Sequence, residues 1–247
     1  MSEIPEQAIR ITPDMLLRRR VDFERRMRRL PPMTLTLIGV LVAIFAAETW
    51  IEALGSAEDL ILIGALSRDA VMQGEWWRLV TAVFLHGGLE HLLGNMIALF
   101  VLGMVCEHAF GRAQFLALFV LSGIAGSLLS MLTSAGPSVG ASGAIFGLQG
   151  AAIVLFRRHR ERLLVRDRRI GVVLIVWALY TIASGLVTPY VDNGAHIGGF
   201  IAGALIARAL HPVLLEPPDD VVRTQIARLR WITAAILVVT AVGWLLR

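Results

Sequence analysis

One serine and one histidine in this 247-residue chain have the chemistry and surroundings of a nucleophile and its base. Ser142 lies in VGASGAIFGLQG, residues 139–150, among small and bulky apolar residues, and His196 lies in AHIGGFIAG, residues 195–203. A serine hydroxyl becomes a good nucleophile when a base removes its proton, and imidazole is suited to that task. We therefore consider Ser142 and His196 a candidate catalytic pair.

Two further polar residues, His91 and Asn95, are four positions apart and therefore share one face of a helix. Ser142 is predicted to begin a helix, and the first backbone N–H groups of a helix have no acceptor within it. Such donors stabilise the negative oxygen of a tetrahedral intermediate. The candidate oxyanion hole thus consists of His91, Asn95 and the backbone amide of Ser142.

The elements that must position these groups are membrane helices. Hydrophobic residues make up 56% of the chain and charged residues only 17%, which leaves little polar material to cover a soluble domain. The apolar residues form blocks near the roughly 20 residues that cross a bilayer. The sequence predicts an all-α polytopic membrane protein with seven spans, at 34–54, 91–110, 113–133, 141–156, 170–187, 195–210 and 231–246.

The distribution of arginine predicts how these spans are oriented. All 23 basic residues are arginine, and they cluster before the first span and between the fourth and fifth spans. The positive-inside rule makes both segments cytoplasmic, together with the N-terminus and the 211–230 linker. This explains the net charge of +4 better than nucleic-acid binding does. The four candidate site residues then lie at a similar depth, near the outer face.

Small residues offer a way to bring the candidate pair together. Gly143 and Gly147 in the fourth span, and Gly199 and Gly203 in the sixth, are small-xxx-small pairs that allow helix backbones to approach closely. If these two faces meet, the hydroxyl of Ser142 and the imidazole of His196 come within hydrogen-bond reach. This contact is an inference from the spacing.

Several other mechanisms are excluded by the sequence. A serine–lysine peptidase needs lysine, and the chain has none. HGGLEH, residues 86–91, lacks the spacing of a zinc-binding HExxH helix, and no predicted span contains the aspartates of an aspartyl membrane protease. Asp192 is the one acid near His196, and we interpret it as a loop residue beside a dyad. His86 is interpreted as a brace of its loop.

Non-catalytic interpretations remain open at this stage. In these interpretations Ser142 is a packing residue, Asn95 is a bridge between helices and His196 is a structural group. The whole chain could then be a transporter or a substrate-binding relative without activity. A transporter would spread polar groups through the membrane depth and show internal repeats. Here the polar groups cluster near one end, and we find no repeat.

Five ordered motifs resemble those of the rhomboid intramembrane serine proteases. They are GEWWRLVT (74–81), HGGLEHLLGNM (86–96), GMVCEHAFG (103–111), GASG (140–143) and AHIGGFIAG (195–203). The resemblance covers residues 34–210. It implies Ser142 as nucleophile, His196 as general base, an oxyanion hole of His91, Asn95 and the Ser142 amide, and a structural role for Glu107.

The resemblance also implies the organisation and the partners of the chain. A cytoplasmic arginine-rich arm (1–33) would precede a six-helix core (34–210), a linker (211–230) and a seventh helix (231–247). The expected substrates are single-pass transmembrane proteins within the lipid bilayer, cleaved without a cofactor, a metal or nucleic acid. Arginine usage and topology point to a bacterial inner membrane. The sequence does not indicate an oligomeric state.

Overall fold

The fold is a bundle of helices, seen in a computed structural model that describes residues 21–134, 136–188 and 191–246. The predicted all-α class is confirmed, since these residues contain helices and two isolated β-bridges but no strand. The long helices are α3 (Pro32–Trp50), α7 (Leu89–Thr133), α8 (Ser142–Arg158), α9 (Val165–Gly185), α10 (Asn193–Ile206) and α11 (Asp220–Leu245). The short ones are α2 (Phe23–Arg26), α4 (Ala57–Ile63), α5 (Arg68–Met72), α6 (Arg78–Thr81) and η1 (Arg160–Arg162). The predicted arm falls mostly on residues 1–20, outside the described part.

Helix α7 contains two of the predicted spans. It runs for 45 residues, too long for one crossing of a hydrocarbon core about 30 Å thick, and it breaks at Gly111, where φ is 76°. A positive φ is readily adopted only by glycine, which makes the reversal possible at this position. After the break the chain folds back, so that both ends of α7 lie near Ser142. By length and hydropathy, α3, α7 and α11 can cross a membrane, and α9 and α10 contain shorter apolar segments.

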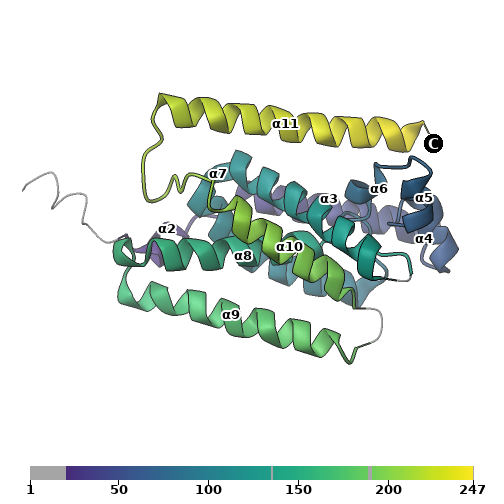
Figure 1. The fold of residues 1–247 in the computed structure, drawn as a ribbon, viewed down its shortest axis with the longest axis horizontal. Helices are drawn as coiled ribbons and strands as arrows, with labels where there is room; N and C mark the ends of the chain where they lie inside the picture. Colours follow the sequence, from purple (N-terminus) through teal and green to yellow (C-terminus); the bar gives the residue numbers. More distant parts are fainter. Residues whose placement is uncertain (1–20, 135, 189–190, 247) are drawn as a thin grey trace, which may run out of the picture.

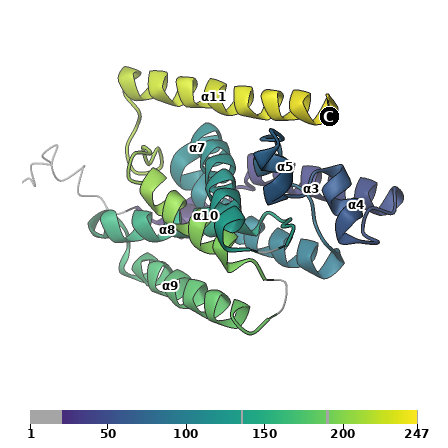
Figure 2. The ribbon, with the colours of Figure 1, turned by 45° about the vertical axis from the view of Figure 1, so that its right-hand side comes forward.

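Helix α8 is the centre of the bundle (Figure 1). Almost every residue from Gly143 to Phe156 is buried, as expected for a helix that is apolar on all sides. It packs against α7, α9 and α10. Helices α9 and α11 lie on opposite sides of the layer formed by α7, α8 and α10, in Figure 1 and again in the turned view of Figure 2.

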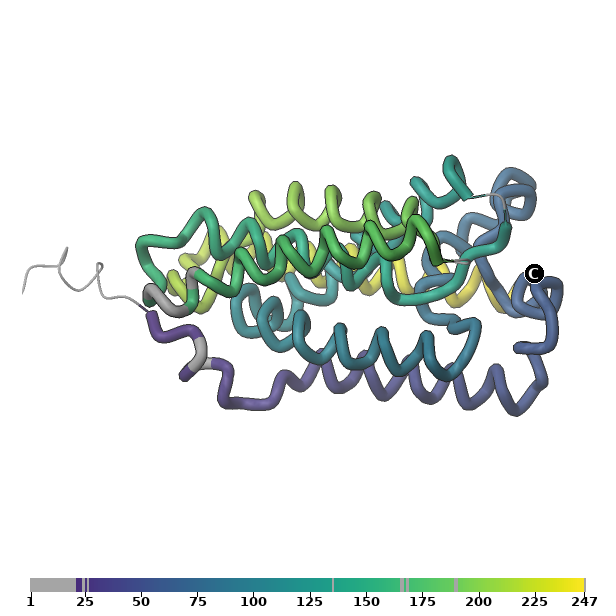
Figure 3. The backbone as a smooth tube through the Cα atoms, turned by 90° about the horizontal axis from the view of Figure 1, so that it is seen from below, coloured from purple at the N-terminus to yellow at the C-terminus, as the bar shows by residue number. Residues whose placement is uncertain are grey.

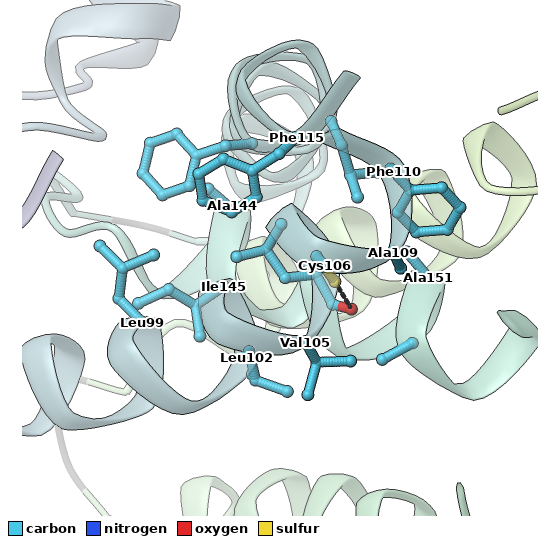
Figure 4. Close-up of a cluster of buried hydrophobic side chains, with 14 of the residues drawn as sticks. Leu99, Leu102, Val105, Cys106, Ala109, Phe110, Phe115, Ala144, Ile145 and Ala151 are labelled. Atoms are coloured by element: carbon cyan, nitrogen blue, oxygen red, sulfur yellow. Dashed lines mark hydrogen bonds between the residues drawn. The ribbon is translucent and has the colours of Figure 1, made fainter. Parts of the chain in front are cut away.

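The apolar core is densest where α7 meets α8. Figure 4 shows Leu99 of α7 beside Ile145 of α8, and Phe115 of α7 near Ala144 of α8. The one polar contact drawn in this cluster runs from the thiol of Cys106 to the carbonyl oxygen of Leu148, at 3.3 Å. Side chains of α7 therefore hold α8 along much of its length.

The start of α3 is held by a buried carboxylate of α7. Glu107 accepts hydrogen bonds from the Met33 and Thr34 amides, at 3.0 and 2.7 Å, and from the Thr34 hydroxyl, at 2.8 Å. These amides belong to the first turn of α3, which has no acceptors of its own. Helix α3 then runs beside the first half of α7, along the lower edge of Figure 3. This gives Glu107 the structural position that the family resemblance implied.

The last helix begins earlier than predicted. Helix α11 starts at Asp220, so the second half of the proposed 211–230 linker is helical and continuous with the seventh span. Asp219 caps the helix by accepting from the Val222 amide at 2.8 Å, and the charged residues that follow are helical although they are too polar for an apolar span. At its other end, the Trp244 indole donates to the Ile63 carbonyl at 2.9 Å.

The loop between α3 and α7 is folded rather than laid flat. The Arg78 guanidinium is buried and donates to Glu75 and to the carbonyls of Ile61 and Ala65, at 2.5, 2.5 and 2.9 Å. Trp77 lies against Gly243 of α11, whereas Trp76 remains 65% exposed. Trp77 and Arg78 are thus held by specific packing, and the exposed Trp76 is suited to a position at the membrane interface.

Candidate active site at the start of α8

Ser142 is the first residue of α8 and is half-buried. The loop before it is held by backbone hydrogen bonds to the α4–α6 region. Gly140 donates to the Ala82 carbonyl at 2.9 Å, and Leu66 and Ser138 exchange two bonds at 3.0 and 3.1 Å. The hydroxyl of Ser142 and the first amides of α8 consequently occupy a fixed position at one end of the bundle.

His91 and Asn95 lie beside this loop. A Cβ added at Gly140 would stand 2.5 Å from His91 Cε1 and 3.6 Å from Asn95 Nδ2. Gly140 also has a φ of 127°, a conformation that favours glycine. The absence of a side chain at Gly140 lets both residues of α7 approach the segment that ends in Ser142.

Helix α10 approaches α8 backbone to backbone. A Cβ at Gly199 would overlap the carbonyl oxygen of Gly143, and a Cβ at Gly203 would overlap that of Gly147. Both predicted small-residue pairs therefore form the contact between these helices. The helix crossing leaves no room for any larger residue at these positions of α10.

His196 lies on the face of α8 that also carries Ser142. Its ring stacks on Phe146, with centroids 4.2 Å apart and planes 9° apart, and Phe146 follows Ser142 by one helical turn. Nδ1 of His196 is buried without a hydrogen-bond partner. Within the described chain no hydrogen bond joins His196 to the Ser142 hydroxyl. The imidazole thus lies one helical turn from Ser142, stacked on Phe146, and its Nδ1 makes no hydrogen bond among the described residues.

Asp192 ties the two helices together at this end. Its carboxylate caps α10 by accepting a hydrogen bond from the Ala195 amide at 2.9 Å. It also accepts hydrogen bonds from three hydroxyls, those of Ser134 at 2.9 Å, Ser138 at 2.7 Å and Ser130. Ser138 belongs to the loop that leads to Ser142. Asp192 therefore bonds to hydroxyls rather than to the imidazole of His196, and it is more than the passive loop residue that we expected.

The surroundings of Asp192 determine its charge. Burial alone would raise the pKa of this carboxyl, but hydrogen bonds from Ser130, Ser138, Ala195 and Ser134 outweigh burial and hold the pKa below its usual value. The folded protein therefore favours the ionised carboxylate.

Two cavities adjoin the site. One of about 10 Å³, the size of a single water molecule, lies against Gly140, Gly143 and Ser127. The other, about 270 Å³, lies between α5 and the end of α7 and is lined in part by Arg68, Asp69 and Ser134. In the described residues, no cluster of His, Cys, Asp and Glu side chains could hold a metal ion.

Some residues of the site were not identified from the sequence. Glu48 of α3 is buried and accepts the backbone N–H of His86, whose ring contacts Asn95. An acidic residue inside a predicted span is a signal that could have drawn attention to Glu48. Nothing in the spacing predicts that Ser130, Ser134 and Ser138 share one carboxylate.

The α8–α10 contact can be tested by adding one methyl group. Gly199→Ala should lower the free energy of unfolding in detergent by about 1–3 kcal/mol, the usual range for overpacking, because the new Cβ has no space beside Gly143. Thermal denaturation followed by circular dichroism measures this. Gly39→Ala is the matched control, since nothing lies within 4 Å of that position. Equal midpoints for both variants would contradict the close contact.

The charge of Asp192 gives a pH-dependent prediction. Because its folded pKa is depressed, its stabilisation is complete above the unfolded value of about 4 and is lost as the pH falls through the folded value. Asp192→Asn should cost about 2 kcal/mol at pH 7, the scale of a charged hydrogen bond. Denaturation at pH 7 and pH 3 should show the gap between parent and variant narrowing in acid. A gap that stays constant would argue against an ionised Asp192.

Comparison with known proteins places the chain in a family. Residues 73–213 match the Rhomboid domain. The Rhomboid protease GluP of Bacillus subtilis is 36% identical over 190 residues, which is 77% of this chain and 35% of GluP. RHOMBOID-like protein 5 of Arabidopsis thaliana is 42% identical over 66% of the chain and 52% of its own length. The chain thus spans about a third and about half of these two relatives.

A third relative is matched over most of its length. The Rhomboid protease AarA of Providencia stuartii is 34% identical over 202 residues, which is 72% of this chain and 72% of AarA. The matched domain includes His91, Asn95, Ser142 and His196. The chain is an integral membrane protein that belongs to the rhomboid family.

Proposed function

We propose that this chain is an intramembrane serine endopeptidase that cleaves transmembrane segments with a dyad of Ser142 and His196. The observation that carries the proposal is the glycine contact between α8 and α10, with His196 on the face of α8 that begins with Ser142. The relatives named as rhomboid proteases support the same activity. We further propose that residues 34–210 form the catalytic core.

The first step is acylation of the serine. Ser142 Oγ attacks the carbonyl carbon of the scissile peptide bond while His196 takes its proton. The carbonyl oxygen becomes an oxyanion that accepts hydrogen bonds from the Ser142 amide, from Asn95 and from His91. One such donor contributes about 3–4 kcal/mol to transition-state stabilisation.

The second half of the cycle releases both products. His196 gives its proton to the leaving amine as the peptide C–N bond breaks, and water then hydrolyses the acyl-enzyme with His196 again acting as base. The cavity beside Gly140 and Gly143 is large enough to deliver such a water. A hydrogen bond between Ser142 and His196 has to form for this chemistry, by a turn of the imidazole over Phe146; catalytic hydrogen bonds often tighten only once the substrate is bound.

The substrate we propose is a single-pass membrane protein that enters from the lipid. A peptide bond inside a helix is shielded from attack, so the segment around the scissile bond has to unwind. Helix-weakening residues such as glycine should therefore favour cleavage. No cofactor or metal is needed for the proposed steps.

We also propose that the Ser142 end faces away from the cytoplasm. The arginines of residues 157–169 and the start of α11 lie at the opposite end of the helices, which the positive-inside rule assigns to the cytoplasm. The N-terminus would then be cytoplasmic. In a bacterium this membrane would be the inner one.

Removal of the nucleophile tests the activity directly. With a single-pass substrate in liposomes, Ser142→Ala should lose at least about a thousandfold in cleavage rate, because the dyad acts as a unit. A fluorophosphonate should label the parent but neither Ser142→Ala nor His196→Ala. Ser184→Ala, a half-buried serine on α9, is the matched control and should cleave normally. Undiminished cleavage by Ser142→Ala would end the serine-protease proposal, and an unlabelled, inactive parent would favour a substrate-binding protein.

The orientation has its own test. A cysteine introduced at Gly136 should react with a membrane-impermeant maleimide on intact cells, whereas one at Arg160 should react only after permeabilisation. Both positions are exposed, and the native Cys106 is buried and serves as an internal control. The reverse labelling pattern would invert the proposed topology.

A further inference from the structure

A buried carboxylate of α3 is linked to the candidate oxyanion hole through one histidine. Glu48 is 2% exposed, and its two oxygens both lie 3.3 Å from the backbone nitrogen of His86. His86 lies in the turn that leads into α7 and is fully buried. Glu48 thereby fixes the backbone from which the His86 ring projects.

The ring of His86 makes a specific contact with Asn95. His86 Nε2 lies 3.1 Å from Asn95 Nδ2, and the ring also meets His91 edge to face at 5.3 Å. The amide nitrogen of asparagine is only a donor, so Nε2 has to be the acceptor in this contact. With the amide nitrogen of Asn95 toward Nε2, a neutral His86 carries its proton on Nδ1, which is buried without a hydrogen-bond partner among the described residues.

This contact links the orientation of the Asn95 amide to the His86 ring. One of the two N–H groups of Asn95 is used by His86, and the other is free for an acceptor near Gly140 and Ser142. If the amide turned over, its oxygen would face the lone pair of Nε2, and an oxyanion would meet an oxygen instead of a donor. The orientation of Asn95 is thus coupled to His86.

We infer that His86 and Glu48 are positioning residues that hold the Asn95 amide as an oxyanion donor. The inference rests on the proposed function, in which Asn95 stabilises the tetrahedral intermediate. Neither residue touches the reacting atoms, and neither exchanges a proton with the substrate. Their effect should therefore appear in the rate of the chemical step and mainly through Asn95, because the described residues show a hydrogen-bond-length contact of His86 with Asn95 and only a ring contact with His91.

Two amide substitutions at His86 provide a matched pair. The side-chain amide of glutamine reaches as far as Nε2, whereas that of asparagine stops about one bond short. His86→Asn should lower kcat by about tenfold to a hundredfold, somewhat less than loss of a whole donor, with KM within twofold. His86→Gln should stay within threefold of the parent. Glu48→Leu should lower kcat as His86→Asn does. Glu48→Gln keeps an acceptor for the His86 amide, so its kcat should stay close to that of the parent.

A double-mutant cycle separates positioning from general stability. In an Asn95→Ala background, His86→Asn should change kcat by less than twofold, because its target is already gone. An undiminished effect in that background, or equal losses for His86→Gln and His86→Asn at equal thermal midpoints, would overturn the inference. Ser142-dependent cleavage by the parent, measured alongside, shows that such a result does not come from failure of the proposed function.

One measurement does not depend on activity. The side-chain 15N–1H signals of Asn95, observed by NMR in detergent micelles, should shift in His86→Asn and stay near the parent positions in His86→Gln. Unchanged signals in both variants would overturn the inference even if the chain cleaved nothing.

Discussion

The contact of two glycine backbones is the constraint on which the site depends. Gly199 and Gly203 of α10 pack directly on the carbonyl oxygens of Gly143 and Gly147 in α8, with no side chain between. Lipid tails are as apolar as helix surfaces, so helices in a bilayer associate through close packing and hydrogen bonds rather than through the hydrophobic effect. Close packing requires small residues here, and it places His196 over the face of α8 that begins at Ser142.

Two buried carboxylates and one half-buried carboxylate hold the helices around this contact. Glu107 caps the start of α3, Glu48 binds the turn before α7, and Asp192 joins the loop before α8 to the start of α10. Each accepts backbone amides or hydroxyls, which offset the cost of removing a charged or polar group from water. Helix packing sets the distance between helices, and these bonds set the position of their ends and loops.

The helices could be predicted to a large extent because hydrophobic blocks report membrane burial directly. The break at Gly111 falls between two predicted spans, and α8 and α10 begin within a few residues of the expected positions. Helix α11 starts about three turns before the predicted span at 231–246, because hydropathy detects the apolar part of a helix and not its charged extension from Asp220. The fold of the Trp77–Arg78 segment depends on partners in α4 and α11 that no local pattern reveals.

The sequence by itself determined which chemical groups exist and on which helices they lie. It also determined, through the spacing of Gly143, Gly147, Gly199 and Gly203, that two of those helices could meet. Only the tertiary structure decided the bonds that orient the groups, such as Glu48 to His86, 38 residues apart, and Ser138 to Asp192, 54 residues apart. Periodicity reports which face of a helix is buried, but a hydrogen bond between distant segments depends on the rotation and register of both, which are set by the packing of the whole bundle.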